Sequence, residues 1–333
     1  MKRIGLIGAG TRTKDYNLPI LELMSDRLEI VGVTTKSGKL REGVKVDAPV
    51  FESITKMIEE TKPDALIVSI KSNLVMEVLD EVIESGLPFV IETTDNTTVY
   101  SKLSSKEAKA GILEQWPFLP LEQFKKQLIN SGALGQILSV ENDYRTYDYH
   151  GAAQLRNYLP DTPPPKLVSI KTLENRYNSE FYVDANDNQK MPALETLRAK
   201  IGFFENGTLL VYKFSDKHKT MPFRNFKSLK IMGSRGSVNG DCLLDKECKI
   251  SVLDDEGNSH DLEIFYRYNE GFISAISCTL PDGRVIEWEN KYGKLSEHQI
   301  ATAYLFDEMI IKDNLFYSPD SALEDMIISY ARG

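Results

Sequence analysis

Hydrophobic and polar positions follow two different patterns along the chain, and the change between them falls near residue 118. The first part alternates short apolar runs, typical of buried parallel strands, with segments in which apolar residues recur at helical spacing. The runs predict strands over Lys2 to Ile7, Leu28 to Thr35, Ala65 to Ile70, Phe89 to Glu92 and Gly111 to Gln115, with helices over Lys14 to Ser25, Ile54 to Thr61, Asn73 to Ser85 and Ser101 to Ala110. This order predicts a doubly wound parallel sheet with helices on both faces.

Strand-like segments joined by hairpin signals dominate the second part. Asn206-Gly207 and Asp282-Gly283 each connect two of these segments, so they indicate antiparallel pairing. The segments are Ala199 to Glu205, Thr208 to Ser215, Ser228 to Met232, Ile250 to Leu253, Leu262 to Tyr268, Phe272 to Leu280 and Arg284 to Glu289. Two helices are expected near the end, one after the Ser296-x-x-Gln299 capping box and one after Ser318-Pro319. We expect an α/β domain over residues 1–118 and an α+β domain with a large open antiparallel sheet over residues 119–333.

The first predicted strand runs directly into Gly8-Ala9-Gly10. A strand, a Gly-x-Gly turn and a helix form the start of a dinucleotide-binding βαβ unit, because glycines allow a tight turn and the helix amides face a pyrophosphate. Thr13 stands where the third glycine of the full fingerprint would be, so the motif is partial. We assign Gly8, Gly10 and Thr11 to cofactor binding and the first domain to the Rossmann class.

The residues at the end of the second predicted strand indicate whether the protein prefers NAD or NADP. An acidic residue there would bind the adenosine ribose 2′-hydroxyl, whereas a basic environment suits the 2′-phosphate of NADP. Thr35 takes the usual acidic position, and Lys36, Ser37 and Arg12 are available to a phosphate. The sequence therefore favours NADP over NAD.

Composition limits the classes of partner. The 333 residues carry a net charge of −9 with a pI near 5.2, so nucleic acid and anionic membrane surfaces are not expected as main partners. The chain starts with a strand, and no apolar run reaches the roughly 18 residues of a membrane span, so we expect a cytoplasmic protein. Cys242, Cys248 and Cys278 lack Cys-x-x-Cys spacing, and neither a disulfide framework nor a metal site is predicted.

Three further segments make the chain similar to the Gfo/Idh/MocA family of oxidoreductases. They are Glu84-Ser85-Gly86-Leu87-Pro88-Phe89-Val90-Ile91-Glu92, Leu128-Ile129-Asn130-Ser131-Gly132-Ala133-Leu134-Gly135-Gln136-Ile137 and Ile231-Met232-Gly233-Ser234-Arg235-Gly236-Ser237. The resemblance covers nearly the whole chain. It implies an NAD(P)-dependent oxidoreductase that acts on a carbonyl, imine or hydroxyl group of a small polar molecule, such as a sugar or cyclitol.

The chain differs from the family pattern at residues that the resemblance assigns to catalysis and cofactor binding. Glu92-Thr93-Thr94 stands in place of the family's Glu-Lys-Pro, so the lysine beside the nicotinamide ribose is absent; we place Glu92 and Thr93 at the cofactor. Lys71, at the end of the neighbouring strand, is a candidate to supply the missing charge. His150 resembles the family's histidine at the start of its catalytic helix, and His150 or Tyr147 is the expected proton donor.

Because the lysine is missing, a second function stays open: a non-catalytic sensor or regulatory protein that binds the dinucleotide without turnover. The second domain is expected to supply substrate contacts. Its open sheet is also expected to form the interface of a homodimer or homotetramer.

Overall fold

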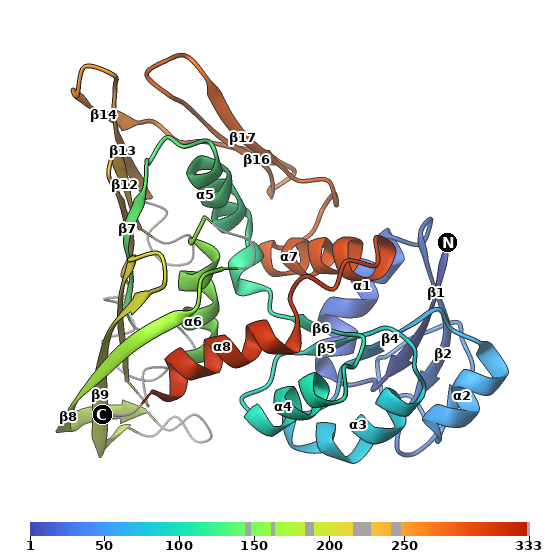
Figure 1. Cartoon of the computed structure of the whole chain (residues 1–333). Coiled ribbons are helices and arrows are strands. Elements are labelled where there is room, and N and C mark those ends of the chain that lie inside the picture. The colour runs from blue at the N-terminus through green and yellow to red at the C-terminus, as the bar shows by residue number, and fades with distance from the viewer. Residues whose placement is uncertain (144–147, 161–163, 184–189, 216–227, 241–247, 332–333) are drawn as a thin grey trace. The chain divides into compact units, whose positions relative to one another are not determined.

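The computed structural model describes residues 1–143, 148–160, 164–183, 190–215, 228–240 and 248–331 (Figure 1). These residues form two compact units, each assembled from segments that are far apart in the sequence. Unit 1 comprises Met1–Leu119, Glu270–Phe272 and Asn290–Leu323, and unit 2 comprises Pro120–Asn269, Ile273–Glu289 and Glu324–Gly333. Tyr147 and Cys242 lie outside the described residues.

Unit 1 is built on a six-stranded parallel sheet with the strand order β3-β2-β1-β4-β5-β6. Its strands are β1 (Lys2–Ile7), β2 (Leu28–Thr34), β3 (Val50–Phe51), β4 (Ala65–Val68), β5 (Phe89–Glu92) and β6 (Ala110–Leu113). Residues of β4 and most of β5 are buried, as expected for strands that are covered on both faces. The predicted doubly wound parallel sheet is confirmed.

Helices cover both faces of this sheet (Figure 1). Helices α2, α3 and α4 contact one another in series, while α1 packs with α7. The helical segments are η1 (Thr13–Asn17), α1 (Leu18–Leu23), α2 (Ile54–Thr61), η2 (Ser72–Leu74), α3 (Val75–Glu84), α4 (Thr97–Ser105), η3 (Trp116–Phe118), α7 (Glu297–Phe306) and η5 (Asp307–Ile311). The helix predicted over Ser101 to Ala110 begins earlier, at Thr97, because the Asn96 side chain caps it by accepting a hydrogen bond from the Thr98 amide.

The first helix of unit 1 opens with a wide π turn, η1, before it continues as α1. Pro19 explains this departure from a regular helix, because its ring has no N–H to donate to the carbonyl of Asp15, four residues earlier. The Gln299 side-chain amide donates to that carbonyl instead, at 3.1 Å. Two segments of the chain that are far apart in sequence thus complete one helix.

Unit 2 contains an eight-stranded sheet in the order β14-β13-β12-β11-β7-β10-β9-β8. Its pairs are antiparallel except for β7 and β10, which run parallel. A separate three-stranded sheet has the order β15-β16-β17. The strands are β7 (Ile137–Asp143), β8 (Leu167–Val183), β9 (Lys190–Phe204), β10 (Leu209–Ser215), β11 (Ser228–Gly233), β12 (Gly236–Asn239), β13 (Lys249–Leu253), β14 (Ser259–Leu262), β15 (Phe265–Asn269), β16 (Phe272–Thr279) and β17 (Val285–Glu289).

The single strand predicted over Leu262 to Tyr268 is wrong, because the chain leaves the large sheet after Leu262 and enters the small sheet at Phe265. Helices α5 (Pro120–Asn130) and α6 (Asp148–Asn157) lie in unit 2, and α6 contacts β7 and β10. Helix α8 (Pro319–Tyr330) starts at the predicted proline. The predicted α+β class of this part is confirmed.

Helix α7 returns the chain to unit 1, where it contacts η1, η3 and α1. Its predicted capping box between Ser296 and Gln299 is present. A single domain boundary after residue 118 would place residues 290–323 in the second domain, whereas these residues pack with the first unit. No helix among the described residues is long and apolar enough to cross a membrane.

Candidate cofactor and active site

The turn after β1 contains two glycines, Gly8 and Gly10, and the structure leaves room for a Cβ atom at only one of them. Gly8 has a φ of +102°, and a Cβ atom there would overlap the carbonyl oxygen of Ser69. The chain itself therefore requires glycine at position 8. A Cβ atom on Gly10 would meet nothing within 4 Å, so nothing among the described residues requires glycine at position 10. A ligand that approaches the backbone closely would explain Gly10.

Thr13 stabilises this turn in place of a third glycine. Its side chain is buried, and its hydroxyl donates to the carbonyl oxygen of Gly8 at 3.0 Å. The partial fingerprint is thus compatible with a well-held turn. Thr11 is exposed at the start of the helix that follows.

The end of β2 shows how the residues predicted to choose the dinucleotide lie. The Thr35 hydroxyl donates to the Lys39 carbonyl oxygen at 3.0 Å and accepts from the Lys39 amide, so it fixes the loop. Lys36 and Ser37 are exposed, and the Lys36 ammonium lies 3.6 Å from a Glu77 carboxylate oxygen. No acidic residue takes the Thr35 position.

Arg12 does not join this group. Its guanidinium Nε lies 3.1 Å from Oε2 of Glu92, and the Tyr16 ring covers the guanidinium at 4.0 Å from the ring centroid. Burial raises the pKa of Glu92, and the nearby Glu114 carboxylate adds to the rise, while Arg12 acts to lower it. Arg12 and Glu92 thus form one charge pair across the end of the sheet.

Buried side-chain atoms without a hydrogen-bond partner mark the same edge. Within unit 1, those among the described residues belong to Arg12, Asn17, Ser69 and Glu92. Arg12 and Asn17 lie in the helix after β1, Ser69 follows β4, and Glu92 ends β5. All of them therefore lie at the carboxyl ends of adjacent strands, which is where open α/β sheets bind ligands. Buried polar groups normally have partners, so this concentration favours a functional site.

The residues that replace the family's lysine motif are used structurally. Thr93 donates its hydroxyl to the Leu113 carbonyl oxygen at 2.9 Å, which joins β5 to β6. The Thr94 and Ser72 hydroxyls lie 2.6 Å apart and connect the loops after β5 and β4. Lys71 is exposed at the start of η2. Its suggested role near the cofactor stays a prediction, whereas Arg12 is the cation in contact with Glu92.

In unit 2, the predicted histidine lies in the first turn of α6. His150 is buried, and its ring lies 4.3 Å from the Tyr149 ring, centroid to centroid. Later in the same helix, Arg156 forms a buried ion pair with Asp325 at 2.7 Å. His150 therefore lies on a helix that is firmly held within the unit, and its role as proton donor stays a prediction.

Sequence analysis missed a charged pair that starts at Asp148, two positions before His150. Lys200 of β9 is fully buried, and its ammonium lies 2.9 Å from Oδ2 of Asp148 and donates to the Ser329 carbonyl oxygen. The other Asp148 carboxylate oxygen is buried without a hydrogen-bond partner among the described residues. Burial raises the pKa of Asp148 to about 6, although Lys200 acts to lower it. A carboxyl group that titrates in this range can exchange a proton near neutral pH.

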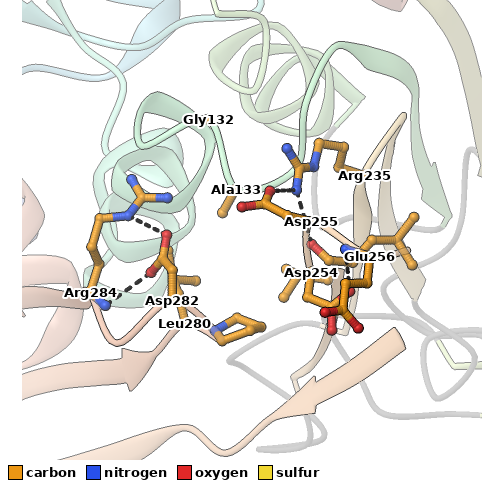
Figure 2. A pocket seen from close by; sticks show the side chains of 12 residues that line it. Gly132, Ala133, Arg235, Asp254, Asp255, Glu256, Leu280, Asp282 and Arg284 are labelled. Carbon is orange, nitrogen blue, oxygen red and sulfur yellow. Dashed lines mark hydrogen bonds and ion pairs between the residues drawn. The ribbon is translucent and has the colours of Figure 1, made fainter. Parts of the chain in front are cut away.

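A pocket of about 360 Å³ lies elsewhere in unit 2 and contains none of the predicted site residues. It is lined by residues 132–133, 252–256 and 280–282 with Arg235 and Arg284. Figure 2 shows its two arginines, Arg235 beside Asp255 and Arg284 beside Asp282, on opposite sides. The lining holds two arginines and four carboxylates, so acidic groups outnumber basic ones.

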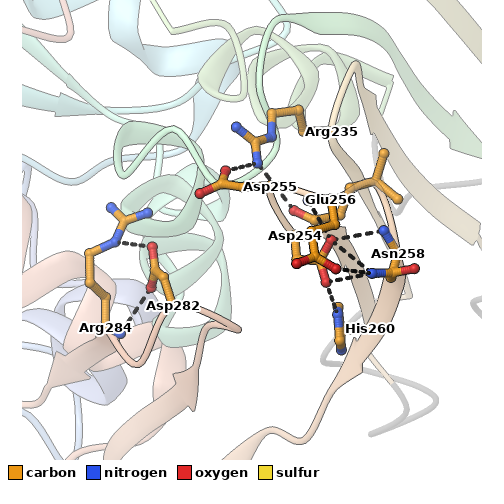
Figure 3. A network of polar contacts seen from close by, with 9 residues as sticks. Arg235, Asp254, Asp255, Glu256, Asn258, His260, Asp282 and Arg284 are labelled. Atoms are coloured by element: carbon orange, nitrogen blue, oxygen red, sulfur yellow. Dashed lines mark hydrogen bonds and ion pairs between the residues drawn. The ribbon is translucent and has the colours of Figure 1, made fainter.

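Asp254 at this pocket is held by local hydrogen bonds. His260 lies 2.8 Å from its carboxylate, and Asn258 donates to it from the backbone and side chain (Figure 3). These bonds hold the pKa of Asp254 well below its usual range. Among the described residues, no group of three or more His, Cys, Asp or Glu side chains could hold a metal ion.

Comparison with known proteins agrees with this geometry. Residues 2–93 match the model of the Gfo/Idh/MocA oxidoreductase family, described by its NAD-binding Rossmann fold. The resemblance predicted from the sequence is thereby confirmed, and the match includes the glycine turn and Glu92. No curated protein matches the sequence.

Several solved structures share the fold. An oxidoreductase from Thermotoga maritima gives a TM-score of 0.63 at 16% identity over 98% of this chain and 94% of that chain. An NAD-binding oxidoreductase from Klebsiella pneumoniae gives 0.66 at 12% identity over 98% and 95%. Levoglucosan dehydrogenase, solved with NADH and levoglucosan, gives 0.65 at 13% identity over 98% and 95%. At these identities the likeness shows the fold alone.

Proposed function

We propose that this chain, whose residues 2–93 match the NAD-binding domain of Gfo/Idh/MocA oxidoreductases, transfers a hydride between a nicotinamide dinucleotide and a small polar molecule. The substrate class is a carbonyl, imine or hydroxyl compound such as a sugar or cyclitol. The observation that carries the proposal is the Gly8–Gly10 turn, which lies at the same sheet edge as the buried polar atoms without partners. The sugar substrate of levoglucosan dehydrogenase supports the proposed class.

The residues present fit a dinucleotide. Open space at Gly10 leaves room for a pyrophosphate against the backbone, and Thr11 begins the helix whose amides would face it. Thr35 follows β2, where the adenosine ribose would be bound. Glu92 and Thr93 lie at the end of β5, farther along the same edge of the sheet and beyond β1 and β4. When bound, the dinucleotide supplies or accepts the hydride.

The remaining chemistry is a proton transfer at the substrate oxygen or nitrogen. A carbonyl that accepts a hydride also needs a proton, and a hydroxyl that loses a hydride must release one. His150 is the proposed donor and acceptor of that proton, since an imidazole exchanges protons near neutral pH. Asp148 lies in the same helical turn and can hold a proton at its carboxylate, while Lys200 orients it.

We propose a preference for NADP over NAD. It rests on Thr35, which takes the position of the acidic residue that binds a ribose 2′-hydroxyl, and on the exposed Lys36, whose ammonium lies 3.6 Å from Glu77. Arg12, the third residue predicted to favour a phosphate, is engaged with Glu92. Titration with NADH and NADPH tests the preference directly, and tighter binding of NADH would remove it without affecting the proposed reaction class.

Calorimetric titration of the protein with each dinucleotide tests the proposed function. Gly10→Ala should weaken binding by about tenfold or more while the melting temperature stays unchanged, because the new methyl group meets only the space left for a ligand. Gly86→Ala is a control for binding at a glycine that lies before β5, at the opposite edge; its φ of +68° strains an alanine, so this variant should lower the melting temperature and leave dinucleotide binding unchanged. Absence of binding to either dinucleotide would refute the proposal.

Turnover distinguishes an enzyme from a sensor. Oxidation of the bound reduced cofactor should be measured with a panel of aldoses, ketoses, cyclitol ketones and imines. His150→Ala should lower turnover by about a hundredfold with little change in cofactor affinity, because general acid catalysis contributes about that much. Unchanged turnover would contradict the role of His150. Tight binding without turnover on any substrate would favour the non-catalytic sensor.

We further propose that a second copy of the chain covers the outer face of the eight-stranded sheet. Ile201 and Phe203 of β9 are exposed there, next to Val211 and Leu209 of β10 in the sheet register. Exposed apolar side chains that gather on one face of a sheet favour an interface.

A further inference from the structure

The ion pair between Arg12 and Glu92 joins two points of the carboxyl edge that are separated by a whole strand. Arg12 follows β1 and Glu92 ends β5, while β4 lies between these strands in the sheet. A dinucleotide with its pyrophosphate at the Gly8–Gly10 turn has its adenosine ribose at the end of β2, so its nicotinamide half extends over β4 and β5. The pair therefore lies on the nicotinamide side of the edge.

The two charges are held in fixed positions. Tyr16 covers one side of the guanidinium, and Nε of Arg12 lies 3.1 Å from the Glu92 carboxylate. The Arg12 side chain is 25% exposed and the Glu92 side chain 16% exposed. Because water screens partly buried charges less than surface charges, each one can act on a further charge several ångströms away. Among the described residues, one nitrogen of Arg12 and one oxygen of Glu92 also have no hydrogen-bond partner.

We propose that Arg12 and Glu92 each shift the relative affinity for the two redox forms of the dinucleotide, in opposite directions, so that the intact pair adds little net preference for either form. This inference rests on the proposed function, because it requires a nicotinamide ring at this edge. The ring carries one positive charge when oxidised and none when reduced, while the phosphates keep their charges. Arg12 therefore repels only the oxidised ring, and Glu92 attracts only the oxidised ring. In the intact protein the two side chains oppose one another.

Dissociation constants of the oxidised and reduced forms test this balance in the wild type, Arg12→Gln, Glu92→Gln and the double variant. The ratio of the oxidised to the reduced constant should fall by about tenfold in Arg12→Gln at a pH high enough to ionise Glu92, because burial raises the pKa of Glu92, Arg12 no longer lowers it, and the ionised Glu92 then acts alone. It should rise by about tenfold in Glu92→Gln. In the double variant it should return to within about threefold of the wild-type ratio, since neither charge remains.

A control pair in the same unit is Arg27 with Asp307, 2.9 Å apart. Arg27 precedes β2 and so lies at the amino edge of the sheet, away from the proposed ligand. Arg27→Gln should leave the ratio within about twofold of wild type. Melting curves establish that each variant is folded. If a single glutamine variant does not fold, the inference is tested with Arg12→Lys, which keeps the positive charge, and with the double variant, which removes both charges. Both should keep the ratio of the oxidised to the reduced dissociation constant, and a tenfold change of this ratio in either variant would overturn the inference.

The possible failures are distinguishable. If the wild type binds neither form, the proposed function fails and this inference fails with it. If both forms bind but the ratio stays constant in the two single variants, or moves in the same direction in both, only this inference is overturned.

Discussion

Replacing Asp148 by asparagine removes the titrating group of the Asp148–Lys200 pair while it keeps the size and shape of the side chain. Two effects on the Asp148 pKa compete in the folded protein. Burial disfavours the charged carboxylate, and the Lys200 ammonium at 2.9 Å favours it. Burial is the larger effect, so the pKa rises from 3.8 to about 6. The folded protein therefore holds a proton on Asp148 at pH values where the unfolded chain has released it.

The sign of the stability change follows from this rise. The protonated carboxyl stabilises the folded state fully only well below pH 3.8, and this contribution is lost as the pH rises through about 6. The difference between the two pKa values corresponds to about 3 kcal/mol over the whole titration. Only 17% of the Asp148 side chain is exposed, so screening by water reduces this value little. Because part of the change occurs below pH 4, the free energy of unfolding of the wild type, relative to Asp148→Asn, should fall by about 2 kcal/mol between pH 4 and pH 7.

Urea denaturation of both proteins at pH 4, 5, 6 and 7 measures this difference, because solvent and temperature are shared and other titrating groups cancel. Asp313→Asn is the control, since Asp313 forms a surface ion pair with Lys2 and its side chain is 59% exposed. Its difference from wild type should change by less than about 1 kcal/mol over the same range. A constant difference for Asp148→Asn would refute the reasoning. A difference that grows with pH would show that the Lys200 charge outweighs burial.

Three further outcomes are expected. Gly8→Ala should lower the melting temperature by several degrees in thermal denaturation, because its φ of +102° and the Ser69 carbonyl exclude a Cβ atom. Lys125→Met leaves Glu122 buried without its ammonium partner and should cost about 3–5 kcal/mol in urea denaturation, whereas a loss below about 1 kcal/mol would contradict the importance of this pair. Phe203→Glu should dissociate the proposed oligomer in sedimentation experiments without lowering the melting temperature, and an unchanged oligomeric state would exclude this face as the interface.

The parts of the fold that the sequence predicts are those with local causes. The apolar runs of β4 and β5 predict buried parallel strands because both faces of the sheet are covered. The capping box at Ser296 predicts a helix start because its hydrogen bonds join residues three positions apart. The split between β14 and β15 could not be predicted, because both segments have the same strand-like composition and only packing assigns them to different sheets.

The candidate site shows the same division. Gly8 and Gly10 can be recognised in sequence because they lie two positions apart directly after an apolar run. Asp148 and Lys200 form an ion pair although they are 52 positions apart in the sequence. In the sequence, Lys200 cannot be distinguished from an exposed polar residue of a strand, and only the structure shows that it is buried. Its neighbours on the same face of β9 are Arg198 and Gly202, so no apolar pattern in the sequence marks Lys200 as buried.

The departure from the family's lysine is best understood from the order of strands in space. Lys71 is a candidate replacement charge because the ends of β4 and β5 are neighbours, but a neighbouring strand end does not fix where a side chain points. Arg12 comes from beyond β4 and reaches Glu92 because its helix starts at the same edge and Tyr16 covers its guanidinium. Residues 80 positions apart thus bring a positive charge to the end of β5. An arginine there stays protonated at any working pH, so it can act on cofactor charge but leaves proton transfer to other groups, and His150 and Asp148 of unit 2 are the proposed ones.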